Sequence, residues 1–183
     1  EAFNLLENLL RWTRNQNGKT KIYATLFNLT PVARQVVSLF SAIANAKEIE
    51  LINRIEGKFD IFADEDMIKT VLRNLISNAI KFTYTGGQVE LSLADSGDYW
   101  TIYVKDNGKG IPKDLQTHLL KSDEYITTYG THNEKGSGLG LILCRDFIRM
   151  NKGKLHFCSQ EGIGTTFYFT IPKASSSAKA ASR

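Results

Sequence analysis

The segment from Ile68 to Phe82 constrains the fold most, because its apolar residues recur at spacings of three and four. This period predicts an amphipathic helix, and its apolar positions are Ile68, Val71, Leu72, Leu75, Ile76, Ala79 and Ile80. Asn74, Asn78 and Lys81 share the opposite face. Two carboxamides and an ammonium group resemble one wall of a metal-nucleotide site. A solvated polar stripe is the alternative, and this segment alone does not decide between them.

Composition places the chain among ordinary globular proteins. It has 183 residues, 42% hydrophobic and 10% aromatic, which suffices for one good core plus appendages. The formal net charge is +4, but residues 173–183 carry three positive charges and no acid, so the remainder is close to neutral. We therefore expect no nucleic-acid partner, and we interpret residues 173–183 as a tail, a linker or an expression remnant.

Cysteine usage and hydropathy restrict the compartment. Cys144 and Cys158 have no CxxC spacing and no nearby histidine cluster, which argues against a zinc site and a disulfide-rich secreted fold. No apolar run approaches the length of a membrane span. We expect a cytoplasmic fragment, and an inner-membrane anchor in the parent protein remains open because the chain begins at Glu1.

The order of predicted elements indicates an α+β fold. We expect a two-layer α/β sandwich, in which a mixed, mostly antiparallel sheet is covered on one face by helices. Helices are predicted from Thr30 to Ala46, from Asp64 to about Phe82, shortly after Pro112, and from Leu139 to Met150. Strands are predicted at residues 21–29, 50–55, 58–62, 88–93, 99–105, 154–159 and 165–171.

An N-terminal helix is predicted to precede this domain. Residues 1–17 form an apolar seam with Phe3, Leu6, Leu9 and Leu10, and Asn17-Gly18 ends it. Nothing earlier in the chain covers that seam. We expect it to pack on a partner helix or a second subunit, with folding back on the domain as the alternative.

Two glycine-containing segments carry further chemistry. Asp106 ends a predicted strand, and Gly108 and Gly110 follow it, so the backbone can approach a ligand closely. An ionised carboxylate accepts hydrogen bonds only, and it selects a donor such as the exocyclic amine of adenine. Residues 136–140, Gly-Ser-Gly-Leu-Gly, lead into a helix whose amino end suits a phosphate. Taken singly, these segments are also typical of an ordinary turn and a hinge.

Together, three ordered blocks resemble a known family. NLISNAIKF at 74–82, DNGKGI at 106–111 and GSGLGL at 136–141 resemble the N, G1 and G2 boxes of sensor histidine kinase ATP-binding domains, members of the GHKL superfamily with the Bergerat fold. The resemblance covers residues 20–172, the expected catalytic domain. Residues 1–17 resemble the end of the dimerisation and phosphotransfer helix.

The resemblance implies a role for each matching position. Asn78 would ligate Mg²⁺ at the triphosphate of ATP beside Asn74, and Lys81 would neutralise phosphate charge, which makes Asn78 and Lys81 the expected catalytic residues. Phe82 would lie near the base. Asp106 would bind the adenine amine, in a pocket shaped by Gly108, Gly110 and Ile111. The phosphate loop would comprise Lys135, Gly136, Ser137, Gly138, Leu139 and Gly140.

Position 74 separates branches of this superfamily. ATP-hydrolysing relatives typically carry a glutamate there, which activates water. An amide cannot act as that general base, so Asn74 favours phosphoryl transfer to a protein nucleophile over hydrolysis.

Two features depart from the family pattern. The stretch after the G1 box, residues 118–123, lacks the usual phenylalanine, which leaves the packing of the ATP lid at residues 121–135 open. None of His118, His132 and His156 lies in a phosphoacceptor context, and we interpret all three as structural or surface residues. The acceptor histidine is expected before Glu1.

The sequence therefore predicts the catalytic domain of a two-component sensor histidine kinase. It would transfer the γ-phosphoryl group of ATP to a histidine outside this fragment. Expected partners are its own dimerisation domain, a second subunit and a response regulator receiver domain. The alternative is a nucleotide-sensing or protein-interaction module of the same fold without phosphotransfer activity.

Overall fold

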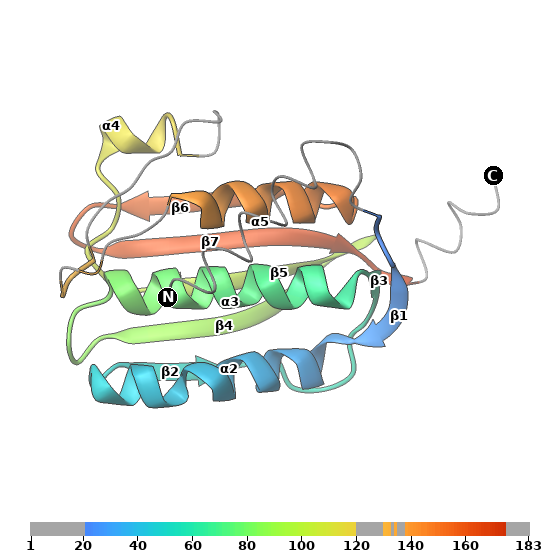
Figure 1. Ribbon diagram of the computed structural model, residues 1–183, viewed down its shortest axis with the longest axis horizontal. Coiled ribbons are helices and arrows are strands. Elements are labelled where there is room, and N and C mark those ends of the chain that lie inside the picture. The colour runs from blue at the N-terminus through green and yellow to red at the C-terminus, as the bar shows by residue number, and fades with distance from the viewer. Residues whose placement is uncertain (1–20, 120–129, 133, 135–137, 175–183) are drawn as a thin grey trace.

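The computed structural model describes residues 21–119, 130–132, 134 and 138–174. The predicted N-terminal helix at residues 1–17 lies outside these residues, as does most of the predicted lid. In the described part, three long helices lie side by side on one face of a five-stranded sheet (Figure 1). The two-layer α/β sandwich expected from the sequence is confirmed.

The helices begin and end where the sequence provides caps. Helix α2 spans Leu29–Ala46, and the Asn28 side chain accepts a hydrogen bond from the amide of Thr30. Helix α3 spans Glu65–Phe82, and its N-cap Asp64 accepts one from the amide of Met67. Helix α4 is one turn, Lys113–Gln116, and α5 spans Leu139–Met150 as predicted.

The main sheet has the strand order β2-β4-β5-β7-β6. Its strands are β2 (Glu50–Asn53), β4 (Gln88–Ser96), β5 (Tyr99–Asp106), β6 (Leu155–Gln160) and β7 (Gly164–Pro172). Only the β2–β4 pair is parallel, and the other three pairs are antiparallel. Strand β5 therefore ends at Asp106 in the middle of the sheet, opposite Val89 of β4 and Thr165 of β7.

The structure contains a second, two-stranded sheet, which the sequence did not predict. Strand β1 (Thr25–Asn28) pairs antiparallel with β3 (Asp60–Ala63). The two β-type runs around Glu56-Gly57 therefore do not pair with each other, although they are neighbours in sequence. Strand β2 instead joins the main sheet beside β4, where its Leu51 packs against the core.

The core lies between the sheet and the helices. Helix α3 is central, and all seven of its predicted apolar positions are buried. They pack among residues of α2, α5 and the inner face of the sheet, such as Val36, Phe147, Leu91, Ile102 and Phe169. Burial of this face turns Asn74, Asn78 and Lys81 toward one rim of the domain.

Candidate functional site

A pocket of ≈ 460 Å³ lies at that rim. Three chain segments meet there, namely the second half of α3, the end of β5 and the beginning of α5 (Figure 1). Of the predicted site residues, the pocket wall includes Asn74, Asn78, Lys81, Phe82, Asp106, Gly110, Ile111, Gly138 and Gly140. The three sequence blocks, up to 67 positions apart, are thus brought into one cavity.

Asn74 is held in a defined orientation. Its Nδ2 donates to the carbonyl oxygen of Thr70 at 2.9 Å, one helical turn earlier. Its Oδ1 faces the first turn of α5, since a Cβ atom added to Gly140 would lie 2.9 Å from it. Asn78, one turn further along α3, lines the same pocket. This side of the pocket therefore carries two carboxamides, and that of Asn74 faces the first turn of α5.

Cationic groups surround the aromatic ring of Phe82. The Nζ atoms of Lys81 and Lys109 lie 4.9 Å and 5.0 Å from the ring centroid. Both lysines line the pocket. The carboxyl end of α3 thus combines an apolar ring with positive charge, which suits a ligand with an aromatic part and an anionic part.

Asp106 is a buried carboxylate, 7% exposed. Its Oδ1 accepts hydrogen bonds from the amides of Gly108 at 2.9 Å and Thr165 at 3.1 Å. Burial raises its pKa to about 6, against the lowering effect of these two amides. Both of these hydrogen bonds go to Oδ1, so the second carboxylate oxygen can accept a donor from a ligand in the pocket.

Gly108 and Gly110 are required by close backbone contacts. A Cβ at Gly108 would overlap the carbonyl oxygen of Phe82, and one at Gly110 would overlap that of Gln160. Gly110 also has a φ of +68°, in the left-handed region. Gly108 itself is not part of the pocket wall. Its role is to let the chain after Asp106 pass against the end of α3.

Helix α5 points its amino end at the pocket. Gly138 takes the N-cap position with a φ of +72° and brings no side-chain acceptor, and Leu139 follows it, buried. The positive end of the helix dipole and the backbone amides of the first turn suit an anion there. Lys135, Gly136 and Ser137 lie outside the described residues.

The pocket also contains residues that sequence patterns did not identify. Thr165 orients Asp106 through its amide, and Lys47 and Glu134 form an ion pair of 3.1 Å in the pocket wall. Lys47 is distant in sequence from the three blocks and has no motif of its own. Glu134 falls in the predicted lid and Thr165 begins a predicted strand, but no pattern indicated their contacts in the site. Leu115 and Leu119, in and after α4, also line the pocket, and Leu119 belongs to the stretch 118–123 that lacks the family's usual phenylalanine.

The histidines lie at the surface, as expected. His118, His132 and His156 are all exposed. The rings of His156 and Tyr168 stack with their centroids 5.3 Å apart. His132 Nε2 lies 3.3 Å from the hydroxyl oxygen of Thr85. None of the three lines the pocket.

Metal-binding clusters and membrane-spanning helices are both missing from the described residues. These residues contain no group of three or more histidine, cysteine, aspartate or glutamate side chains arranged to hold a metal ion. None of the helices in this part of the chain is both long and apolar enough to cross a bilayer.

Known proteins resemble this chain in sequence and fold. The adaptive-response sensory kinase SasA of Crocosphaera subtropica is 30% identical over 170 residues, covering 92% of this chain and 44% of the relative. The circadian input-output histidine kinase CikA of Synechococcus elongatus is 31% identical over 172 residues, 92% of this chain and 23% of the relative. The chain thus spans less than half the length of either relative.

Solved structures agree with this similarity. The catalytic domain of histidine kinase ThkA superposes with a TM-score of 0.70 at 31% identity, covering 82% of this chain and 96% of that one. Full-length ShkA in complex with AMPPNP superposes with a TM-score of 0.78 at 26% identity, and the match covers 93% of this chain and 35% of the ShkA chain. The family profile described as histidine kinase-, DNA gyrase B-, and HSP90-like ATPase matches residues 63–175. The chain belongs to this family of ATPase-fold domains, and its similarities lie with sensor histidine kinases.

Proposed function

We propose that this domain binds ATP with Mg²⁺ and transfers the γ-phosphoryl group to a histidine of its parent protein. The observation that carries the proposal is the pocket itself. It combines a buried acceptor, Asp106, with a cationic and carboxamide wall on α3 and the amino end of α5. The structural similarity to the ThkA catalytic domain supports the same assignment.

The adenine base is assigned to the Asp106 end of the pocket. The exocyclic amine of adenine donates a hydrogen bond to the Asp106 carboxylate, while Ile111 and Phe82 supply apolar surface. Guanine carries an oxygen at that position, which would leave a buried acceptor unpaired at a cost of about 1 to 3 kcal/mol. We therefore expect ATP to bind in preference to GTP.

The phosphates are assigned to the space between α3 and α5. Lys81 neutralises phosphate charge, and the backbone of Gly138, Leu139 and Gly140 surrounds the phosphates at the amino end of α5. The absence of Cβ at Gly140 keeps the gap to Asn74 open. The equivalent roles of Lys135, Gly136 and Ser137 remain predictions from the sequence.

The donor set fits magnesium held jointly by protein and nucleotide. Mg²⁺ keeps several water ligands and commonly takes only one or two protein ligands plus phosphate oxygens. We assign the Asn78 carboxamide as such a ligand, supported by its position in the pocket wall together with Asn74. When bound, the ion would neutralise charge on the β- and γ-phosphates. The protein residues would hold the triphosphate in one orientation.

Transfer is favoured over hydrolysis by the side chain at position 74. Asn74 donates one amide hydrogen to the Thr70 carbonyl oxygen, and its carboxamide has no basic site to accept a proton from water. The nucleophile must then come from outside this pocket. We assign it to a histidine of the dimerisation and phosphotransfer domain, to which residues 1–17 would connect.

The remaining partners follow from this assignment. We propose that the parent protein acts as a dimer and passes the phosphoryl group to a response regulator receiver domain. The catalytic domain would work in the cytoplasm, where ATP is available. The names of relatives such as SasA and CikA are consistent with signalling kinases.

The test is a phosphotransfer assay in trans. This chain is mixed with the dimerisation domain of its parent protein and γ-labelled ATP, and acid-labile phosphohistidine is measured. We expect label on the added domain, and an Asn78→Ala variant should lose most of it. Binding of ATP without any phosphohistidine would instead favour a nucleotide-sensing module. Steady phosphate release by the chain alone would favour a hydrolysing ATPase.

A further inference from the structure

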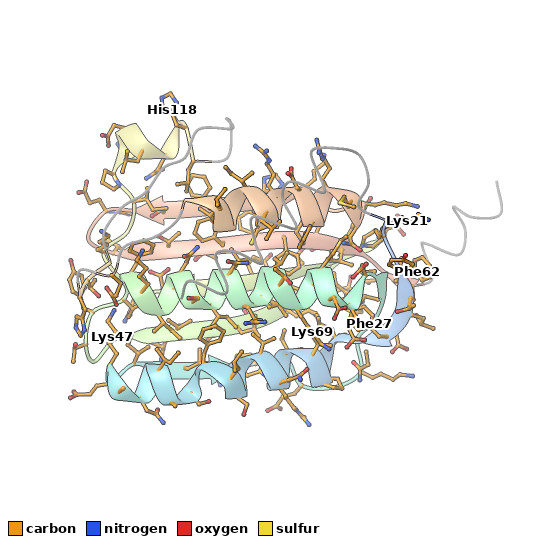
Figure 2. All side chains as sticks on the ribbon, viewed as in Figure 1. Lys21, Phe27, Lys47, Phe62, Lys69 and His118 are labelled. Carbon is orange, nitrogen blue, oxygen red and sulfur yellow. The ribbon has the colours of Figure 1, made fainter. Side chains whose placement is uncertain are left out.

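Lys47 is a buried lysine in the wall of the pocket. It follows the last residue of α2, and Figure 2 shows it at the end of the molecule where α2 and α3 finish. Its side chain is 7% exposed. The Nζ atom donates to the carbonyl oxygens of Ile80 and Lys81, each at 3.0 Å, and to Glu134 Oε1 at 3.1 Å. All three ammonium hydrogens therefore have an acceptor.

Glu134 belongs to a short segment that leads toward the second glycine loop. The described residues of this segment, 130–132 and 134, are tied to the carboxyl end of α3. Thr131 donates from its amide to the Lys81 carbonyl oxygen at 3.1 Å, and its hydroxyl donates to the Thr83 carbonyl oxygen at 2.8 Å. The Lys47–Glu134 pair adds a charged link at the same place. One lysine thus connects α2, α3 and this segment.

The position of Glu134 creates an electrostatic problem for an anionic ligand. Glu134 lines the pocket together with Lys47 and Lys81. Burial opposes ionisation of Glu134, but hydrogen bonds from the amides of Glu134 and His132 and from Lys47 outweigh it and lower its pKa. A carboxylate is therefore present beside the space assigned to phosphates, and an unpaired one would repel them.

We propose that Lys47 is a positioning residue that fixes residues 130–132 and 134 on the end of α3 and neutralises Glu134, so that the pocket accepts the phosphates of a nucleotide. This inference rests on the proposed nucleotide-binding function. It assigns to Lys47 an action through Glu134, not a contact with the nucleotide.

If Lys47 acts through Glu134, the charge of Glu134 determines how much ADP affinity is lost when Lys47 is replaced. Lys47→Gln retains donors for the carbonyl oxygens of α3 but leaves the carboxylate without its cation. We expect it to weaken ADP binding by about tenfold. Glu134→Gln removes the carboxylate itself, and we expect a change within about threefold. The double variant, Lys47→Gln with Glu134→Gln, should bind ADP at least about threefold more tightly than Lys47→Gln alone.

Adenosine separates this effect from a general structural role. It has no phosphate, so its affinity should change by less than about threefold in Lys47→Gln. The matched control is Lys69→Gln, which removes the cation from the Glu65–Lys69 pair of 2.8 Å on α3. Figure 2 shows Lys69 well separated from Lys47. This control should bind ADP and adenosine like the unmodified protein.

Isothermal titration calorimetry of the full chain with ADP and adenosine measures these affinities, and thermal unfolding checks each variant. Should Lys47→Gln fail to fold, the double variant is compared with Glu134→Gln alone; their ADP affinities should agree within about threefold, because neither protein carries the carboxylate that Lys47 neutralises. Equal losses of ADP and adenosine affinity, or no rescue in the double variant, would overturn the proposal. If the unmodified protein bound neither ligand, the proposed function would fail instead.

Discussion

At the scale of single residues, Asp106 combines a cost in stability with a gain in selectivity. An acid whose pKa is raised in the folded state binds its proton more tightly there than in the unfolded chain. The folded state therefore loses stability as the pH rises from about 4 to 6. The ionised carboxylate is retained in the pocket wall, where it can accept a hydrogen bond from a ligand.

Asp106→Asn should accordingly stabilise the protein without nucleotide. The amide oxygen can still accept from Gly108 and Thr165, while the buried charge is removed. We expect the free energy of unfolding at pH 7 to rise by about 1 to 3 kcal/mol, measured by urea denaturation. A fall in stability would show that the charge of Asp106 stabilises the fold, and it would contradict this prediction.

The pKa of Asp106 also predicts how binding depends on pH. A protonated carboxyl group no longer offers a charged acceptor to the adenine amine, so affinity should fall as the pH drops through about 6. Adenosine is the suitable ligand because it has no phosphate that titrates in this range. Its affinity at pH 5 should be about tenfold weaker than at pH 7.5. A flat profile between these values would contradict the role of Asp106.

At the scale of elements, the amino end of α3 is stabilised by one buried N-cap residue, Asp64. Asp64 accepts from the amide of Met67 at 3.1 Å and from that of Tyr23 at 2.9 Å, so it joins the helix to the chain before β1. Asp64→Ala should lower the free energy of unfolding by about 1 to 2 kcal/mol. The control is Asp66→Ala, an exposed first-turn acid that makes no cap, with an expected loss below about 1 kcal/mol. Equal losses would refute the capping role.

The first turn of α5 is shaped by its contact with α3. A methyl group at Gly140 would press on Asn74 Oδ1, whereas alanine itself favours a helix. Gly140→Ala should therefore weaken ATP binding by about fivefold or more, while stability stays within about 1 kcal/mol of the unmodified protein. Calorimetry and thermal unfolding on the same sample measure both quantities. Unchanged affinity would show that the Asn74–Gly140 gap is not used by the phosphates.

The helices were predictable from the sequence because their information is local. Periodicity and caps placed α5 at Leu139–Met150, the end of α2 at Ala46 and the cap of α3 at Asp64. Strand partners depend on contacts distant in sequence. The sequence therefore did not predict that β1 pairs with β3 or that β2 lies parallel to β4.

At the scale of the whole molecule, the pocket belongs to no single element. The three sequence blocks were identified because each has a pattern of its own, and the fold brings their described residues to one rim. Lys47 has no such pattern. Glu134 lies in the predicted lid and Thr165 in a predicted strand, but their contacts depend on how α2, the segment before α5 and β7 pack. The sequence thus indicated the chemistry of the site, and only the fold revealed the residues that support it.

The central claim is that this pocket binds ATP through Asp106. Its most direct test is calorimetric titration of ATP, with Mg²⁺ present, into the unmodified chain and the Asp106→Asn variant. We predict saturable binding at one site by the unmodified protein and at least about tenfold weaker binding by the variant. Equal affinities in the two proteins, or no binding by the unmodified chain, would contradict the claim.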